Sequence, residues 1–277
     1  MKACTTCLVL KEESEFNLYR LKRRSQCRNC QSNEGRIYYQ RNREKIREKQ
    51  RVLDGPGQGR WGPRTDPELP AVLDEVERQV IIGGLLGDGS LTHGKRQITP
   101  AYRERHGLAQ ENYLRWKGEM LHRMKPRIVP NASNIGSKSY GGWVLSTIAN
   151  PTLNEFAKFY EDSKKIVPQD MADELGPLGL AVWLQDDGYL AVPKTGRPYM
   201  TVCSMSFTWE ENEMLVDRIR IITGNMRTAV MKAPSGSKAQ IYIGPSALED
   251  VASLVAPFWH SDLKYKFPYP DMLTREK

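Results

Sequence analysis

The apolar positions between residues 71 and 277 recur in two similar runs. Val80–Leu86 leads into Asp88, and Leu180–Leu184 leads into Asp187, 99 residues later. A glycine follows each aspartate, and after it strand-like and helix-like stretches alternate in the same order. The pattern therefore predicts an α+β protein in which the element order α-β-β-α-β-β-α occurs twice.

The predicted elements occupy matching places in the two halves. In each half two hairpin-like stretches flank a helix: 90–105 and 127–148 around Gln110–Met124, and 189–207 and 227–243 around Trp209–Ile222. Three helix starts match the capping-box pattern, at Thr208-x-x-Glu211, Thr152-x-x-Glu155 and Ser246-x-x-Glu249. We expect the first half to span residues 71–166 and the second half residues 167–277.

The first apolar run contains three glycines, at positions 83, 84 and 87. A glycine inside a helix costs about 1 kcal/mol relative to alanine, so close packing against a second helix must compensate. The helix of the second run, Leu180–Gly188, is the expected partner, with Gly89 and Gly188 ending the two helices. Asp88 and Asp187 would then meet at one end, where their repulsion favours divalent cations, and carboxylate oxygens suit Mg²⁺.

Four of the five cysteines form two close pairs, Cys4-x2-Cys7 and Cys27-x2-Cys30, with 19 residues between the pairs. This spacing predicts a four-thiolate Zn²⁺ site with a structural role, because no ligand position stays open. Two disulfides or free thiols are the alternative. We expect a zinc module over residues 1–35. Cys203 lies in a strand-like run and is expected to be buried.

A basic helix and a linker are expected to join the zinc module to the repeats, over residues 36–70. Residues 36–52 hold many good helix formers and neither Gly nor Pro, whereas residues 54–70 are rich in both.

The positive charge is confined to this N-terminal part. Residues 1–60 hold 15 Lys and Arg against 7 Asp and Glu, whereas the rest of the chain holds 26 of each. A basic arm of this kind indicates a nucleic-acid partner, and a solvated basic tail is the alternative. The chain has no apolar run of membrane-spanning length and no apolar segment at its start. We therefore expect no membrane association and a cytoplasmic location, in a bacterial or phage-infected cell, or an organellar one.

The two acidic motifs resemble those of LAGLIDADG homing endonucleases. Leu85-Leu86-Gly87-Asp88-Gly89-Ser90-Leu91 matches one form of the motif, and Ala181-x-Trp183-x-x-Asp186-Asp187-Gly188 matches a form found in single-chain members with two motifs. The resemblance covers about residues 76–275 and implies a pseudo-twofold αββαββα fold that binds double-stranded DNA as a monomer. Leu86 stands where the family name has its first Asp, which is not the catalytic position.

The resemblance also implies the site residues. It places catalytic Mg²⁺ on Asp88 and Asp187, and a basic residue beside each centre, at Lys165 and Lys266. The lysines follow their aspartates by 77 and 79 residues, as a duplicated site requires. Surface lysines at the end of a polar helix are the alternative for Lys164 and Lys165. Asp186 is interpreted as a solvated carboxylate, or as one that supports the site without binding metal.

The N-terminal module resembles zinc-ribbon segments that precede nuclease domains in phage and bacterial proteins. The matching residues are Cys4–Cys7, Glu15-Phe16, Arg24–Cys30 and Asn42–Glu48. Such relatives often carry an HNH nuclease, but His93, His106, His122 and His260 do not form an HNH pattern. Nor do protein-splicing cysteine and histidine blocks flank the acidic motifs, so an intein origin is not expected.

Together these features predict a homing endonuclease that hydrolyses one phosphodiester on each DNA strand with Mg²⁺, and the resemblance implies that the cuts leave short 3′ overhangs. An RNA-binding intron maturase and a non-cleaving DNA-binding regulator of the same fold are the alternatives. Base and phosphate contacts are expected from polar side chains of the sheets. The candidates are Lys95, Arg96, Gln97, Arg103, Lys138, Lys194, Arg197, Lys232, Lys238 and Gln240.

Overall fold

The protein is described by a computed structural model, in which the chain forms two compact units, Met1–Gly62 and Pro63–Lys277. The structure describes residues 1–19, 22–35, 37, 38, 40–42, 68–92, 99–135, 138–233, 236 and 238–273. The division within Pro63–Lys277 and the exact module boundaries given above stay predictions.

The N-terminal unit is built from two small hairpins and a helix. β1 (Lys2–Ala3) pairs with β2 (Leu10–Lys11), and β3 (Leu18–Tyr19) pairs with β4 (Lys22–Arg23). Residues 28–35 are helical, as are residues 37, 38 and 40–42, so the helix begins well before residue 36. The predicted helix beyond residue 42 and the linker up to residue 67 lie outside the described residues. Cys4, Phe16 and Cys27 form the buried centre of this unit.

The larger unit contains the predicted repeat. Its first half has α2 (Glu75–Leu86), β5 (Ser90–Thr92), β6 (Ala101–Gly107), α3 (Glu111–Met120), β7 (Arg127–Ile135), β8 (Lys138–Ser146) and the 3₁₀ segment η4 (Pro151–Phe159). Its second half has α4 (Gln169–Glu174), α5 (Pro177–Asp187), β11 (Gly188–Ala191), β12 (Tyr199–Val202), α6 (Trp209–Thr223), β13 (Thr228–Lys232), β14 (Ala239–Ile243) and α7 (Pro245–Val255). A short hairpin of β9 (Tyr160–Glu161) and β10 (Lys164–Lys165) joins the halves.

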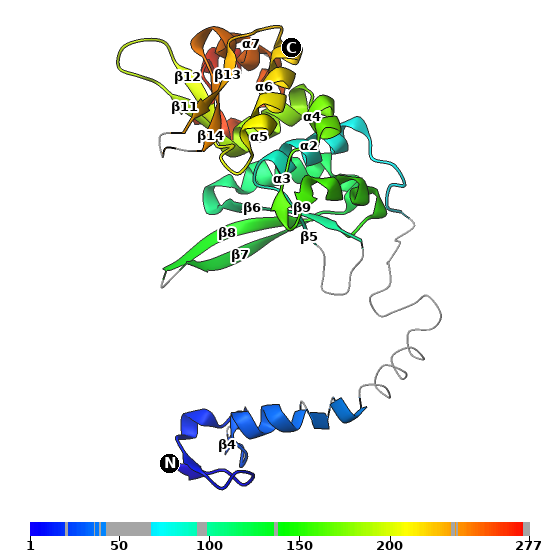
Figure 1. The fold of residues 1–277 in the computed structure, drawn as a ribbon, viewed down its shortest axis with the longest axis vertical. Coiled ribbons are helices and arrows are strands. Elements are labelled where there is room, and N and C mark those ends of the chain that lie inside the picture. Colours follow the sequence, from blue (N-terminus) through cyan, green and yellow to red (C-terminus); the bar gives the residue numbers. More distant parts are fainter. Residues whose placement is uncertain are drawn as a thin grey trace. The chain divides into compact units, whose positions relative to one another are not determined.

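The two four-stranded antiparallel sheets share one strand order. The first runs β5-β6-β8-β7 and the second runs β11-β12-β14-β13. In Figure 1, α2 and α5 lie side by side in the middle of the unit, with one sheet on either side. The duplicated α+β architecture is thus confirmed.

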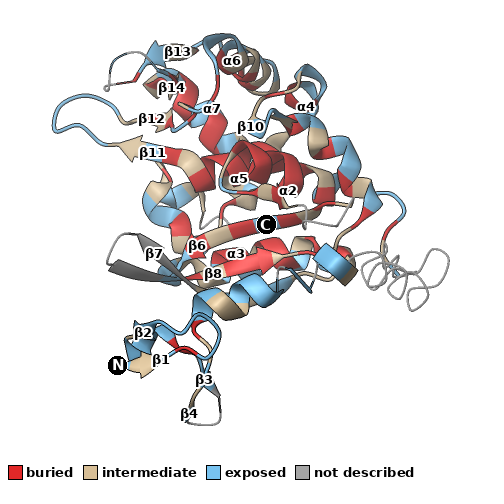
Figure 2. Cartoon of the chain, turned by 60° about the horizontal axis from the view of Figure 1, so that its bottom comes forward, coloured by how far each residue is buried: buried red, intermediate tan, exposed pale blue. Residues whose placement is uncertain are grey.

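The paired helices α2 and α5 form the most buried part of the unit (Figure 2). A Cβ added at Gly83 would lie 2.2 Å from the Gly179 carbonyl oxygen, and one added at Gly87 would lie 2.7 Å from the Asp186 Cβ. The glycines therefore allow the two backbones to approach closely, as the sequence predicts. Sheet and helix side chains of both halves join these helices in a single hydrophobic core.

Several local predictions are wrong in detail. α2 ends at Gly87 rather than Gly89, whereas α5 ends at Gly188 as expected. The capping box at Thr208 and Glu211 is present, but Asn150 caps η4 in place of Thr152, and α7 begins after Gly244 without a side-chain cap. Lys164 and Lys165 form a strand, not the end of a helix. Among the residues that the structure describes, every helix is too short or too polar to span a lipid bilayer.

Candidate active site

Asp88 and Asp187 stand at the C-terminal ends of the paired helices α2 and α5. The Asp88 side chain is 46% exposed, whereas Asp187 is partly buried. Burial, together with the nearby charges of Asp88 and Asp186, raises the pKa of Asp187 to about 7. The ionised form of Asp187 is therefore destabilised by burial and by neighbouring negative charges, and a bound cation would relieve this repulsion.

Each helix end is contacted by one of the two predicted lysines. Lys165 Nζ donates to the Gly87 carbonyl at 2.8 Å, and Lys266 Nζ donates to the Gln185 and Asp186 carbonyls at 2.8 and 3.0 Å. Burial lowers the pKa of both lysines, against the opposing effect of the neighbouring carboxylates. The lysines satisfy helix-end carbonyls where a positive charge is favoured, and they bring one ammonium group to each motif.

Asp186 is fully buried and is not the solvated carboxylate that the sequence suggested as one alternative. Its Oδ1 accepts from Lys117 Nζ at 2.8 Å and from the Tyr113 hydroxyl at 2.8 Å. The Asp186 carboxylate of the second motif therefore lies among side chains of the first half. The Asp186 side chain has room here because Gly87 of the first motif lies opposite it and has no side chain. Burial raises the pKa of Asp186 to about 6, although Lys117 opposes this.

A buried charged network that was not predicted from the sequence lies beneath Asp88. Lys117 Nζ bonds to Glu104 Oε1 and to Asp186, and the Tyr102 hydroxyl donates to Glu104 Oε2 at 2.6 Å. His106 Nε2 also bonds to Glu104 Oε1. We define these six side chains as the inner network: Tyr102, Glu104, His106, Tyr113, Lys117 and Asp186.

The charges of the inner network keep one another ionised. Burial would raise the pKa of Glu104, but the Lys117 charge and the hydrogen bond from His106 hold it well below its usual range. Burial would lower the pKa of His106, but Glu104 raises it above its ordinary value. The buried Lys117 ammonium is stabilised by its two carboxylate partners, Glu104 and Asp186. Without Lys117, each buried carboxylate would destabilise the folded protein.

The sequence does contain a signal for this network. In β6 the residues at positions 102, 104 and 106 alternate with exposed or partly exposed ones, so Glu104 and His106 share the inner face with Tyr102. Lys117 lies three residues after Leu114 and four before Leu121, both fully buried, so it belongs to the buried face of its helix. Charged residues at core positions mark such a network.

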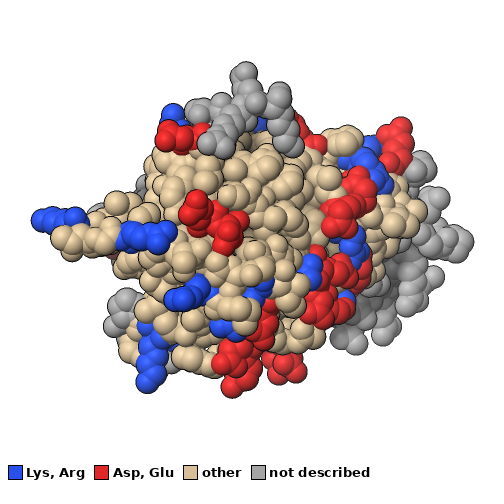
Figure 3. Space-filling model, turned by 90° about the horizontal axis from the view of Figure 1, so that it is seen from above, with Lys and Arg blue, Asp and Glu red and all other residues tan. Residues whose placement is uncertain are grey.

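The predicted DNA contacts fall in different places. Arg103 is exposed on β6, Lys194 and Arg197 are exposed between β11 and β12, Lys232 ends β13, and Lys238 is exposed before β14. Gln240 on β14 is buried, with 8% of its surface exposed. Lys138 begins β8, and Lys95, Arg96 and Gln97 lie outside the described residues. On the face shown in Figure 3, acidic and basic side chains are interspersed rather than gathered by sign.

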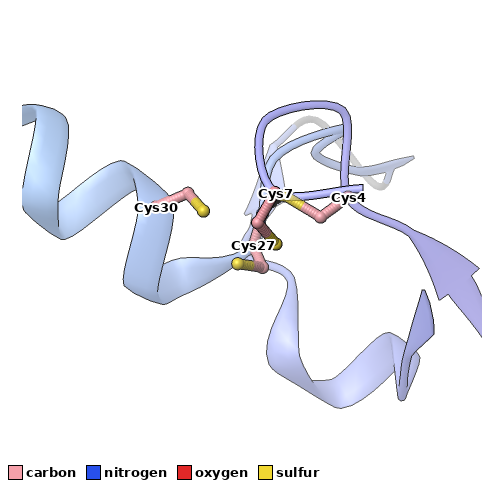
Figure 4. A group of neighbouring side chains, drawn as sticks. All are labelled: Cys4, Cys7, Cys27 and Cys30. Atoms are coloured by element: carbon pink, nitrogen blue, oxygen red, sulfur yellow. Dashed lines mark hydrogen bonds between the residues drawn. The ribbon is translucent and has the colours of Figure 1, made fainter. Parts of the chain in front are cut away.

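The four predicted zinc ligands come together in the N-terminal unit. The Sγ atoms of the four cysteines all lie within 4.8 Å of one another: Cys4, Cys7, Cys27 and Cys30. Figure 4 shows Cys30 projecting from the helix, while Cys4 and Cys7 come from the turn that follows β1. Cys203, by contrast, is exposed, so the expectation that it is buried is wrong: β12 ends at Val202, one residue before it.

Several known proteins are similar to this chain. "Protein RecA" of Mycolicibacterium flavescens is 27% identical over 216 residues, which are 74% of this chain and 49% of that protein. The chain spans about half the length of the first of these curated relatives. "DNA endonuclease I-ChuI" of Chlamydomonas applanata is 32% identical over 151 residues, 49% of this chain and 67% of that protein. "Cytochrome b mRNA maturase bI2" of Debaryomyces hansenii is 26% identical over 208 residues, 70% of this chain and 74% of that protein.

One solved structure and one family model match most of the larger unit. The homing endonuclease I-WcaI, solved bound to its DNA recognition sequence, aligns with a TM-score of 0.64 and 21% identity over 74% of this chain and 94% of that one. Residues 78–248, which include both acidic motifs, match the model of the LAGLIDADG DNA endonuclease family. The chain belongs to the LAGLIDADG DNA endonuclease family.

Proposed function

We propose that the chain is a site-specific endonuclease that hydrolyses one phosphodiester on each strand of double-stranded DNA. The observation that carries the proposal is the pair of carboxylates, Asp88 and Asp187, at the ends of two packed helices, each helix end with its own half-buried lysine. A single centre would cut one strand, whereas two related centres match the antiparallel strands of a duplex.

The donor set fits Mg²⁺. Asp88 and Asp187 would hold the cations, because both offer carboxylate oxygens and because burial, together with the charge of Asp88, raises the pKa of Asp187. When bound, such ions activate water and stabilise the leaving oxygen. Lys165 and Lys266, fixed by helix-end carbonyls, would place a positive charge beside each scissile phosphate and orient it.

The outer faces of the two sheets would hold the DNA. On the first sheet, Arg103 and Arg127 are both exposed and both pair with Ser146 of β8, which places them on either side of it. On the second sheet, the rings of Tyr199 and Tyr242 lie 5.2 Å apart, centroid to centroid. Arginine binds phosphates and guanine edges, and tyrosine can donate to phosphates, so both surfaces suit a duplex.

A second candidate function is that of an RNA-binding intron maturase. It is favoured by the maturase of Debaryomyces hansenii, whose similarity extends over 70% of this chain. A DNA-binding regulator that does not cut is the third possibility of this fold. The intact pair Asp88 and Asp187 favours cleavage over both.

One experiment separates the three functions. The full chain is first used to select DNA from a randomised duplex library, and the bound DNA is then incubated with the protein and Mg²⁺. We expect double-strand breaks within one recovered sequence and short 3′ overhangs. Selection of a sequence without any cutting would show a regulator, and failure to select DNA together with binding to structured intron RNA would show a maturase.

We further propose that the N-terminal unit holds one structural Zn²⁺ and extends the contact with DNA. The Cys27 and Thr6 backbone N–H groups donate to Cys4 Sγ at 3.3 and 3.4 Å, and these bonds favour a thiolate. The hydrogen bond from Cys27 is the main reason that the pKa of Cys4 is lowered to about 6.

The zinc proposal is tested by metal analysis of the purified chain. We expect one zinc per chain, lost in Cys27→Ala and retained in Cys203→Ala, which removes a cysteine outside the cluster. A protein without zinc, or equal zinc in both variants, would contradict the assignment. Weaker binding to DNA in Cys27→Ala, with cleavage at saturating protein unchanged, would show that the module adds affinity.

A further inference from the structure

His106 lies beside Asp88, in a position that the proposed mechanism leaves unused. Its Nδ1 is 3.8 Å from Asp88 Oδ2, and its side chain is only 2% exposed. The imidazole therefore forms part of the inner wall of the Asp88 centre, while the Asp88 carboxylate, 46% exposed, stands at the open side.

The inner network fixes the orientation of the ring. Nε2 bonds to Glu104 Oε1, and Glu104 is an ionised acceptor held by Lys117 and Tyr102. A carboxylate in this position accepts a hydrogen bond from Nε2–H, and Nδ1 then faces outward. Nδ1 then has two oxygen neighbours, Gln110 Oε1 at 3.2 Å and the Asp88 carboxylate. Both oxygens accept, so without a cation Nδ1 carries a proton, which a bound cation would displace into solvent.

This arrangement is that of a metal-binding histidine. Ligating imidazoles usually donate their second ring N–H to a carboxylate, which fixes the tautomer and raises the basicity of the ligating nitrogen. Asp88, His106 and Asp186 each offer a ligand atom within 4.8 Å of the others. Asp186 is already bound to Lys117 and Tyr113, so Asp88 and His106 are the two groups left to bind an ion.

At the corresponding positions of the second centre, which the structure describes, no imidazole nitrogen is present. Gly188 pairs with Val202, and extending the register of β5 and β6 by one residue places Gly89 opposite Glu104. Val202 therefore corresponds to Glu104, and Ser204 corresponds to His106. Ser204 is fully buried and bonds to Asn212, so it has neither the imidazole nor the carboxylate behind it.

We propose that His106 Nδ1 is a ligand of the divalent cation at Asp88, and that this centre therefore prefers Mn²⁺ to Mg²⁺ more strongly than the Asp187 centre does. An imidazole nitrogen favours Mn²⁺ and the later transition metals, whereas Mg²⁺ prefers oxygen. The inference rests on the proposed function only in placing a cation at Asp88.

The test is pulsed electron paramagnetic resonance of the full chain, loaded with zinc at its cysteines and then with Mn²⁺. We expect a ¹⁴N coupling to Mn²⁺ that is lost in His106→Ala and kept in His122→Ala, a change at an exposed histidine. Because His106→Ala can disturb the inner network, Asp88→Asn serves as a second variant. It should remove the same coupling, whereas Asp187→Asn should retain it.

A second readout is the affinity for each ion, measured without DNA. His106→Ala should weaken Mn²⁺ binding at the Asp88 centre by at least about tenfold, with a smaller effect on Mg²⁺. A wild-type protein without nitrogen coupling, or a coupling that survives His106→Ala, would overturn the inference. A protein that shows the coupling but cuts no DNA would refute the proposed function and leave the ligand assignment standing. A protein that cuts DNA but shows no nitrogen coupling would refute the ligand assignment and leave the proposed function standing.

Discussion

The two halves of the larger unit share one fold but differ in what lies beneath their carboxylates. Under Asp88, the inner face of β6 carries Tyr102, Glu104 and His106, all buried and hydrogen-bonded. The corresponding row on β12 and just beyond it, under Asp187, is Met200, Val202 and Ser204. The duplicated architecture is thus preserved, while the row beneath Asp88 carries charged side chains and the row beneath Asp187 carries none.

The difference can be traced to the contact between the motif helices. Gly87 and Asp186 face each other across this contact, and a Cβ at Gly87 would lie 2.8 Å from Asp186 Oδ2. Only one of the two motifs can therefore carry a carboxylate at this position. Since Asp186 points into the first half, that half must supply the cation, and Lys117 does so. The packing of the two motif helices thus determines which half contains the buried charged residues.

The largest expected effect comes from removing the buried cation. Lys117→Met leaves Glu104 and Asp186 buried without their partner and should cost about 3–5 kcal/mol of unfolding free energy. Lys158→Met, which breaks an exposed ion pair with Asp170, should cost at most about 1 kcal/mol. Urea denaturation at neutral pH compares the two. Equal losses would mean that the inner network contributes no more than a surface pair.

A smaller effect is expected from closing the space between the motif helices. Gly83→Ala places a methyl group 2.2 Å from the Gly179 carbonyl oxygen, so the helices must separate, at a cost of about 1–3 kcal/mol. Gly107→Ala is the matched control, since nothing lies within 4 Å of the added carbon. Thermal unfolding followed by circular dichroism would reveal the difference. If Gly83→Ala is as stable as Gly107→Ala, the close approach of α2 and α5 is wrong.

The third expected effect is a pH dependence from the second centre. The pKa of Asp187 is raised to about 7, so the folded protein binds its proton more tightly than the unfolded chain. Without divalent cations, this group stabilises the fold below its unfolded pKa, and the contribution is lost as the pH rises through about 7. Stability should therefore fall from pH 4 to pH 7 less steeply in Asp187→Asn than in the wild type. Parallel profiles would contradict the raised pKa.

The sequence predicts the repeated architecture well because it depends on local patterns. The spacing of Asp88 and Asp187, the matching order of elements and the capping box at Thr208 lead to the observed sheets and helices. The glycines at 83 and 87 also indicate their helix partner correctly. Each of these features is visible within a window of a few residues or in the comparison of two such windows.

The inner network depends on contacts that no local pattern specifies. Lys117 and Asp186 are 69 positions apart in the chain, and their pairing follows from the packing of α3 against the ends of the motif helices. Asp186 was predicted to be solvated or supporting because its sequence neighbours do not reveal the space opened by Gly87. Cys203 was expected to be buried because the strand-like pattern continues past Val202, where the strand itself ends.

The most direct test of the account replaces each motif aspartate in turn and follows the two DNA strands separately. Using a selected target with a different label on each strand, we expect Asp88→Asn and Asp187→Asn each to abolish double-strand cleavage in Mg²⁺ while DNA binding persists. Cutting of both strands at the wild-type rate by either variant would contradict the assignment of two carboxylate centres at the ends of α2 and α5.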